Sequence, residues 1–294
     1  MTVDASATGV WQGLDQAALD RAYDQAAWAP NMHAVLARYA QRSQAARERL
    51  GEPRRIAYGA GVNEALDFFS CGGQGAPLVA FIHGGAWRSG KARDYAFVAE
   101  PLVRRGAHVA IPDFDWVQDR DGDLAVLADQ VVRALAALLG QAHVLGIDPA
   151  RVHLVGHSSG AHLAALAATR AGEPGLPAGA VRSLVCCSGL YELEPVRRSA
   201  RSRYLRLDDA AVEALSPLRR THRLQAAVRG VCGALESPQF LWQAQAWAQA
   251  VQAAGLPVTH EVAAGLNHFE VLEALVDAAH PLGARLPGWL GLPA

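Results

Sequence analysis

Short runs rich in apolar residues recur along the chain, and longer stretches with helical spacing of their apolar residues separate them. Continuous apolar runs of this length are typical of strands that are buried on both faces of a sheet. The strands predicted in this way lie at residues 78–82, 107–111, 152–155, 183–187, 228–232 and 258–262. Two shorter strands, 56–58 and 65–69, are predicted ahead of them, with a glycine-containing turn between the two.

The stretches between the strands predict helices, and the order of the elements indicates the architecture. The helices are expected at residues 15–24, 31–50, about 93–105, 122–142, 160–171, 238–254 and 269–278. Strands that alternate with helices pair in parallel through right-handed crossovers. We therefore expect one α/β domain over residues 1–294, with a mostly parallel central sheet of about eight strands and helices on both faces. Reactive groups in such a sheet gather beyond the carboxyl ends of its strands.

Composition and charge argue against several classes of function. Hydrophobic residues make up 51% of the 294, and 27 basic against 28 acidic residues give a net charge of −1. That balance favours neither nucleic acid nor an anionic membrane as a partner. No apolar run approaches the roughly 20 residues that span a bilayer, and the first residues lack a signal-peptide pattern. The four cysteines lack metal-ligand spacing. We expect a cytoplasmic protein with reduced thiols, no metal and no organic cofactor.

The sequence Gly-His-Ser-Ser-Gly at 156–160 lies between a predicted strand and a predicted alanine-rich helix. A serine in this G-x-S-x-G context sits on a tight strand-to-helix turn that exposes its hydroxyl. The flanking glycines are needed because the chain folds back closely beside the serine, where a Cβ would clash. Ser158 is therefore the candidate nucleophile.

A serine nucleophile needs a base and an acid that orients the base, and in sheets of this type the chain order is Ser, then Asp or Glu, then His. Glu236 and His268 follow the predicted strands 228–232 and 258–262, and each precedes a helix. These two residues complete the predicted catalytic triad. The less well placed alternatives are Glu192, Asp208 and Asp209 for the acid, and His260 and His280 for the base.

Donors for the oxyanion are predicted in the His-Gly-Gly-Ala-Trp segment at 83–87, directly after a buried strand. Its glycines allow close approach of a substrate carbonyl to the backbone. We assign the oxyanion hole to Gly84, Gly85 and Ala86, with the N–H groups of Gly85 and Ala86 as donors, and to the N–H group of Ser159. Loss of one such donor typically costs roughly 3–4 kcal/mol of transition-state stabilisation.

Two segments, FIHGGAW at 81–87 and GHSSGAHL at 156–163, are accompanied by more specific ones, CSGLYELEP at 187–195 and ESPQF at 236–240. LDRAY at 19–23, SPL at 216–218 and NHF at 267–269 support them. The first two segments resemble the α/β-hydrolase superfamily, and together the segments resemble its kynurenine formamidase (arylformamidase) branch. The chain departs from the branch at Ala86, where a bulky aromatic residue is usual, and at Glu236, where aspartate is common.

The resemblance implies a serine hydrolase that cleaves N-formyl-L-kynurenine, a step of tryptophan degradation, to L-kynurenine and formate through a formyl-serine intermediate. The implied partner is a small aromatic formamide or ester. Candidates to line an aromatic pocket are Trp87, Trp116, Tyr191 and Phe269. An arginine of the 197–206 cluster could pair with a substrate carboxylate.

Three functions stay open at this point. The first is an arylformamidase, and the second is a carboxylesterase of broad specificity, which Ala86 would favour by enlarging the pocket. The third is a non-catalytic ligand-binding protein on the same fold. The sequence also leaves open whether residues 1–50 form a lid, whether about 190–220 form a cap-like insertion, and whether the chain is a homodimer.

Overall fold

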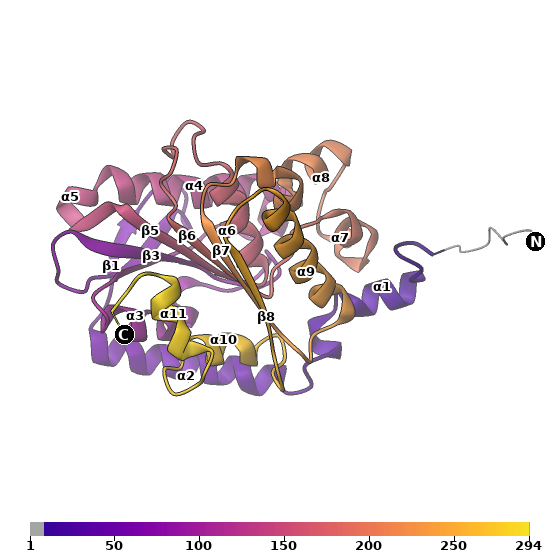
Figure 1. Cartoon of the computed structure of the whole chain (residues 1–294), viewed down its shortest axis with the longest axis horizontal. Coiled ribbons are helices and arrows are strands. Elements are labelled where there is room, and N and C mark those ends of the chain that lie inside the picture. The colour runs from indigo at the N-terminus through magenta and orange to yellow at the C-terminus, as the bar shows by residue number, and fades with distance from the viewer. Residues whose placement is uncertain (1–8, 294) are drawn as a thin grey trace, which may run out of the picture.

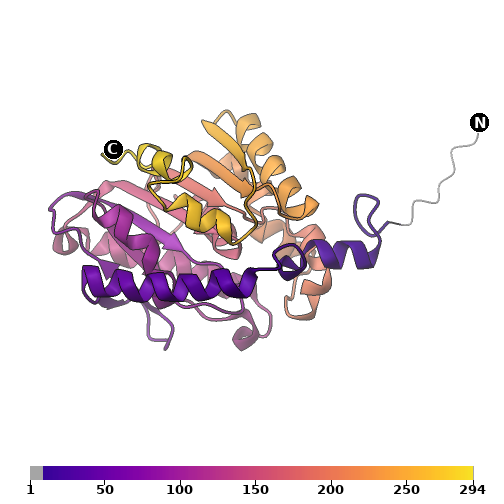
Figure 2. The same cartoon turned by 90° about the horizontal axis from the view of Figure 1, so that it is seen from below.

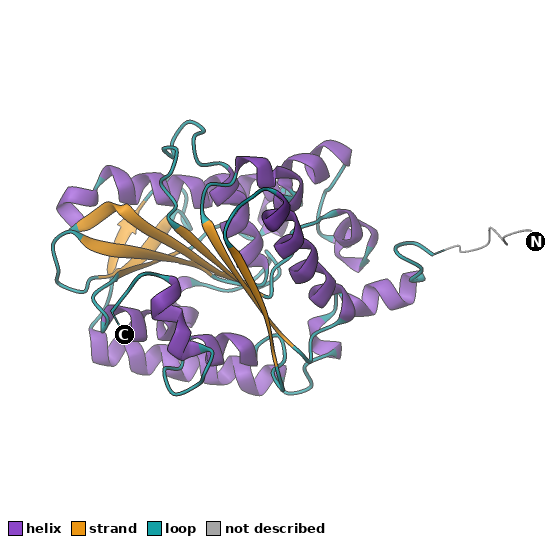
Figure 3. Ribbon diagram, in the orientation of Figure 1, coloured by secondary structure: helices purple, strands orange, loops and turns teal. Residues whose placement is uncertain are grey.

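An eight-stranded sheet runs through the molecule with helices on both of its faces (Figures 1 and 3). The computed structural model describes residues 9–293. The strands lie in the order β1-β2-β4-β3-β5-β6-β7-β8; β1, β2 and β4 pair antiparallel and all other neighbours pair in parallel. Their bounds are Arg54–Ala57 (β1), Ala65–Phe69 (β2), Ala76–Ile82 (β3), His108–Pro112 (β4), Ile147–His157 (β5), Ser183–Cys187 (β6), Ala227–Gly233 (β7) and Val258–Ala263 (β8). The expected α/β-hydrolase architecture is confirmed.

The α-helices follow the predicted stretches, and additional short helices lie between them. Their bounds are Gln16–Ala22 (α1), Met32–Leu50 (α2), Ala99–Val103 (α3), Leu124–Gly140 (α4), Ala142–Leu145 (α5), Ser159–Thr169 (α6), Glu194–Arg198 (α7), Asp209–Leu215 (α8), Pro238–Ala253 (α9), Glu270–Leu275 (α10) and Leu286–Trp289 (α11). Six 3-10 helices accompany them: Gln25–Ala27 (η1), Ala92–Val98 (η2), Val117–Arg120 (η3), Ala200–Arg203 (η4), Pro217–Arg223 (η5) and Gly283–Arg285 (η6).

Two apolar layers hold the helices to the sheet. On one face α4, α6 and α9 pack through side chains such as Leu127, Leu163 and Trp247. On the other face α2, α3 and α10 contribute Val35, Leu102 and other buried residues, and Figure 2 shows α2 lying across that face. Burial of each large apolar side chain contributes about 1.5–3 kcal/mol. The central strands are therefore fixed from both sides, as their continuous apolar runs predict.

The structure differs from the sequence prediction at two elements. The single helix expected over about 93–105 is divided into η2 and α3, because Pro101 has no N–H to continue the α-helical bonding back to Phe97. The strand β8, expected to be buried on both faces, forms an edge of the sheet, and Ala263 is its one buried residue. In the described part of the chain no helix is both long and apolar enough to cross a membrane.

Candidate active site

The side chains of Ser158, His268 and Glu236, which belong to three separate loops after β5, β8 and β7, meet at one edge of the sheet. The Oγ atom of Ser158 lies 2.9 Å from Nε2 of His268. The Nδ1 atom of His268 lies 2.7 Å from Oε2 of Glu236. Because a carboxylate only accepts, Nδ1 carries the proton and Nε2 is free to accept the serine hydroxyl proton. This geometry is that of a nucleophile activated by a general base.

Ser158 sits on a strained turn between β5 and α6. Its φ of 56° and ψ of −127° lie outside the regions that L-residues favour. Gly160 makes the turn feasible, because a Cβ there would lie 2.1 Å from the carbonyl oxygen of Ile82. Strain of this kind persists only where the surroundings enforce it, and it concentrates at functional sites. Gly160 thus permits the close approach of the helix start to the end of β3, which the turn at Ser158 requires.

The carboxylate of Glu236 is enclosed and hydrogen-bonded on both oxygens. Its side chain has no solvent exposure. The Oε1 atom accepts from the Ser188 hydroxyl at 2.5 Å and from the Gly233 N–H at 2.7 Å, while Oε2 accepts from His268. Donors of this kind stabilise a buried carboxylate and fix its orientation. Ser188 was not identified from the sequence as part of the site. The signal for it is its place directly after β6, where its positive φ of 54° aims the hydroxyl at Glu236.

The loop that carries His268 is held by the N-terminal segment. The Tyr39 hydroxyl of α2 donates to the carbonyl of Phe269 at 2.5 Å. The Asn267 side-chain amide donates to Asn31 at 2.7 Å, next to the start of α2. Residues 9–50 therefore contribute to the position of the base. The sequence prediction that residues 1–50 act as a lid stays a prediction, and its first eight residues lie outside the described part.

Three backbone N–H groups stand beside Ser158 without a partner. Within residues 9–293, the N–H groups of Gly85, Ala86 and Ser159 donate to no protein acceptor. Gly85 and Ala86 line the same cleft as Ser158, and the Trp87 N–H donates to Oγ of Ser159 at 3.2 Å, which ties this loop to α6. Free, preorganised N–H groups are what an oxyanion requires. Gly84 instead packs beneath the nucleophile, where a Cβ would lie 3.2 Å from Cβ of Ser158.

His157 remains neutral beside the triad. Burial, and then the nearby charge of His268, lower the pKa of His157 to about 3. Its Nε2–H donates to the backbone carbonyl of His268 at 2.8 Å. The imidazole of His157 thus holds the backbone of the base and adds no positive charge to the site.

The triad opens into a cleft of about 770 Å³, a volume in the range of small-molecule sites. The cleft is lined by the N-terminal segment, the loop after β3 and η4, with residues that include Tyr23, Met32, Leu36, Tyr95, Tyr204 and Phe269. Part of the cleft is therefore aromatic and aliphatic. Among residues 9–293, no group of three or more His, Cys, Asp or Glu side chains is placed to hold a metal ion.

Of the four predicted pocket aromatics, Phe269 alone lines the cleft. The indole of Trp87 is buried in the core, where its Nε1–H donates to His162 at 3.3 Å. The Tyr191 ring is also buried and stacks on Trp247 at 4.9 Å. Trp116 donates to the Gly90 carbonyl outside the cleft. The prediction was wrong for these three, and for Trp87 and Tyr191 the reason is that their rings pack in the buried core.

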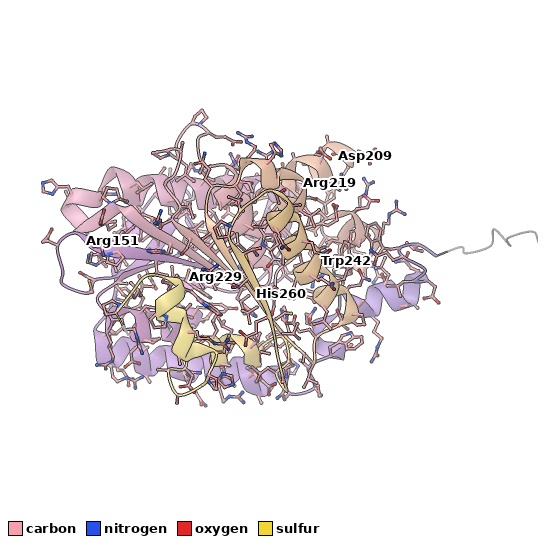
Figure 4. All side chains as sticks on the ribbon, viewed as in Figure 1. Arg151, Asp209, Arg219, Arg229, Trp242 and His260 are labelled. Carbon is pink, nitrogen blue, oxygen red and sulfur yellow. The ribbon has the colours of Figure 1, made fainter. Side chains whose placement is uncertain are left out.

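The rival acids and bases have other partners. Glu192 pairs with Arg219, and Asp208 accepts from the backbone N–H of Ala211 as the N-cap of α8. Figure 4 shows Asp209 on α8 and His260 on β8, and the Asp209 side chain is 94% exposed. None of these three carboxylates hydrogen-bonds His268.

The chain is similar in sequence to one family model and to several named proteins. The BD-FAE family model matches residues 67–182, which include the loop after β3 and the nucleophile turn. A protein of the zebrafish Danio rerio named kynurenine formamidase is 26% identical over 96% of this chain and 98% of its own length. A Drosophila melanogaster protein of the same name is 24% identical over 67% of this chain and 68% of its own.

Solved structures share the fold. A Silicibacter protein named as a candidate thioesterase superposes with a TM-score of 0.80 at 28% identity, covering 90% of this chain and 97% of that one. The carboxylesterase EstE1, from a metagenomic library, gives a TM-score of 0.68 at 17% identity, covering 88% and 95%. At that lower identity the likeness concerns the fold alone.

Proposed function

We propose that this chain, an α/β-hydrolase of the arylformamidase and esterase type, hydrolyses N-formyl-L-kynurenine to L-kynurenine and formate. The observation that carries the proposal is the likeness to the zebrafish kynurenine formamidase over 96% of the chain. The contacts among Ser158, His268 and Glu236 supply the groups that such a reaction needs.

In the first half of the proposed reaction, the Ser158 oxygen attacks the formyl carbon while Nε2 of His268 takes the hydroxyl proton. The negative oxygen of the tetrahedral intermediate accepts from the N–H groups of Gly85, Ala86 and Ser159. Glu236 holds the imidazole and stabilises its positive charge. When the C–N bond breaks, Nε2–H of His268 donates its proton to the leaving aryl amine. An aryl amine leaves more readily than an alkyl amine, which suits an esterase-like site.

In the second half, water hydrolyses the formyl-serine ester. His268 takes a proton from the water, whose oxygen attacks the formyl carbon at the same oxyanion hole. Collapse of the intermediate returns the proton to Oγ of Ser158 and releases formate. The reaction then needs no group beyond those that surround Ser158.

A carboxylesterase of broad specificity is the second candidate. Ala86 favours it, because a small side chain at the edge of the cleft leaves room for larger acyl groups than formyl. The two candidate functions differ in the size of the acyl group that the enzyme accepts. In both of them Ser158 is the nucleophile.

A substrate panel separates them. Purified protein would be assayed for kcat/KM with N-formyl-L-kynurenine, formanilide, acetanilide, and p-nitrophenyl acetate and butyrate. A formamidase should favour N-formyl-L-kynurenine and lose activity steeply from formyl to butyryl groups. Higher kcat/KM with the p-nitrophenyl esters than with N-formyl-L-kynurenine would contradict the formamidase proposal and support the esterase. The Ser158→Ala variant should lose nearly all turnover with every substrate.

A further inference from the structure

Arg201 is a buried cation without an acidic partner. It is the one arginine or lysine among residues 9–293 that is buried, with 7% exposure. It takes part in no ion pair in that range, whereas its neighbours Arg197 and Arg198 both pair with Glu194. A buried charge is costly unless it is paired. The guanidinium must therefore be compensated by other means.

The contacts of Arg201 satisfy one side of its guanidinium only. Its Nε and Nη2 atoms donate to the Tyr23 carbonyl at 3.2 and 2.9 Å. The group also lies 5.7 Å from the ring of Trp87 and 5.9 Å from that of Tyr23, where the ring faces attract a cation. The third nitrogen, Nη1, is buried and has no hydrogen-bond partner in the described part of the chain. Both N–H bonds of Nη1 are thus left for a ligand.

Gln25, which lines the same cleft as Arg201, presents a second unpartnered group within residues 9–293. Gln25 opens η1, two residues after Tyr23, and it is 8% exposed. Among the residues that the structure describes, neither its amide nitrogen nor its amide oxygen has a hydrogen-bond partner. Buried amides nearly always find partners in native proteins, so an unpartnered one calls for an explanation. Because the amide has both donors and an acceptor, it can bind a carboxylate or an ammonium group.

Arg201 and Gln25 are both among the residues that line the cleft containing Ser158 and His268. Two carboxylates, Asp20 and Asp24, line it as well, and each already accepts from backbone N–H groups. Asp20 receives the Ala200 N–H at 2.6 Å, and Asp24 receives the Ala26 N–H at 3.1 Å. Arg88 and Arg203 also line the cleft, but both are exposed, whereas Arg201 and Gln25 are buried and keep unpartnered side-chain atoms within residues 9–293.

We propose that Arg201 and Gln25 bind the carboxylate of an acid-bearing leaving group, and so select aryl formamides or esters that carry a free carboxylate. The proposal rests on the proposed hydrolase function and specifies the substrate class of that site. A carboxylate between Nη1 of Arg201 and the amide of Gln25 compensates the buried charge with charge-assisted hydrogen bonds. The same substrate then extends along the cleft toward Ser158. Arg201 and Gln25 are specificity residues, and they take no part in bond making.

The test compares two substrates that differ in the carboxylate alone. N-formyl-L-kynurenine carries it, and N-formylkynuramine lacks it. The kcat/KM for N-formyl-L-kynurenine divided by that for N-formylkynuramine should fall about 10- to 100-fold in Arg201→Met. Most of this change should come from a higher KM for N-formyl-L-kynurenine. Arg201→Lys should recover part of the loss, since it keeps the charge without the fork. Gln25→Met should lower the ratio less, because it removes no charge. Arg206→Met is the matched control, because Arg206 is exposed, belongs to the same arginine cluster and does not line the cleft.

A binding measurement on Ser158→Ala protein covers the case in which an Arg201 variant fails to fold. By calorimetry, L-kynurenine should bind at least tenfold more tightly than kynuramine. Equal affinities for L-kynurenine and kynuramine, or an equal loss of kcat/KM with both formyl substrates in Arg201→Met, would overturn the proposal. Arg201 would then have only a structural role, through its hydrogen bonds to the Tyr23 carbonyl. If only the proposed function is wrong, N-formyl-L-kynurenine would not be turned over. The kcat/KM for p-formyloxybenzoate would still exceed that for phenyl formate, and Arg201→Met would reduce this difference.

Discussion

Removal of the Ser188 hydroxyl should slow the enzyme without weakening substrate binding. Ser188 touches no part of the cleft that a substrate would occupy. It donates at 2.5 Å to Oε1 of Glu236, whose other oxygen holds His268. In Ser188→Ala, Oε1 keeps only the Gly233 N–H. Any effect on rate must therefore pass through the carboxylate and the imidazole, which makes Ser188 a positioning residue.

The size of the effect follows from the kind of bond. A hydrogen bond to a charged group contributes about 1.5–3 kcal/mol. Because two donors to Glu236 remain, we expect the lower end of this range to reach the transition state. A barrier increase of about 1.4 kcal/mol is a tenfold decrease in kcat. KM should stay near the wild-type value, since the bond acts on the base and not on the bound substrate.

The assay is steady-state hydrolysis of p-nitrophenyl acetate and of N-formyl-L-kynurenine by Ser188→Ala. Its matched control is Ser183→Ala, at the opposite end of the same strand β6, where the hydroxyl lies 2.8 Å from Nδ1 of His153. Both variants lose a buried hydrogen bond and should unfold more readily. Only Ser188→Ala should lose kcat. Equal kcat values for the two variants would refute the inferred role of Ser188.

The remaining predictions concern stability. Gly160→Ala should prevent folding or strongly destabilise the protein, because its Cβ would lie 2.1 and 2.3 Å from backbone carbonyl oxygens at the end of β3. Gly140→Ala, whose Cβ would lie in open space, should be neutral or stabilise the protein by up to about 1 kcal/mol. Similar thermal midpoints for the two variants would contradict this. Burial lowers the pKa of His157 to about 3 and that of His162 to about 4. Between about pH 6.5 and pH 4 the unfolded chain binds protons that the folded chain excludes. The free energy of unfolding should therefore decrease as the pH is lowered through this window, by up to roughly 1.4 kcal/mol per pH unit for each of the two histidines. Urea unfolding at pH 7, 5.5 and 4.5 measures this, and equal midpoints would show that these imidazoles titrate normally.

Much of the fold and the chain positions of the triad could be predicted from the sequence. Strands buried on both faces leave continuous apolar runs, and β3, with all seven residues buried, is the clearest case. The residues Ser158, Glu236 and His268 each follow a strand that the sequence predicts, and parallel strands bring their carboxyl ends to one edge. The order of elements was therefore enough to expect the contacts at 2.9 and 2.7 Å that the structure contains.

Other features depend on packing that a single sequence does not reveal. An aromatic residue in an active-site segment can face the cleft or the core, and Trp87 and Tyr191 face the core. The arginine cluster offered five equivalent candidates, and burial against Tyr23 distinguishes Arg201 from the others. The hydroxyl of Ser188 reaches Glu236 only because the backbone after β6 adopts a positive φ. The orientation of the two aromatic rings and the burial of Arg201 follow from long-range contacts, which leave no local signature in the sequence.

Covalent labelling tests the central claim, the activation of Ser158 by His268, most directly. The protein would be treated with diisopropyl fluorophosphate and analysed by intact mass and peptide mapping. We expect one diisopropylphosphoryl adduct, located on Ser158, with loss of activity in proportion to labelling and no adduct in Ser158→Ala. An active protein that stays unlabelled, or that carries the adduct on another residue with Ser158 unmodified, would contradict the account.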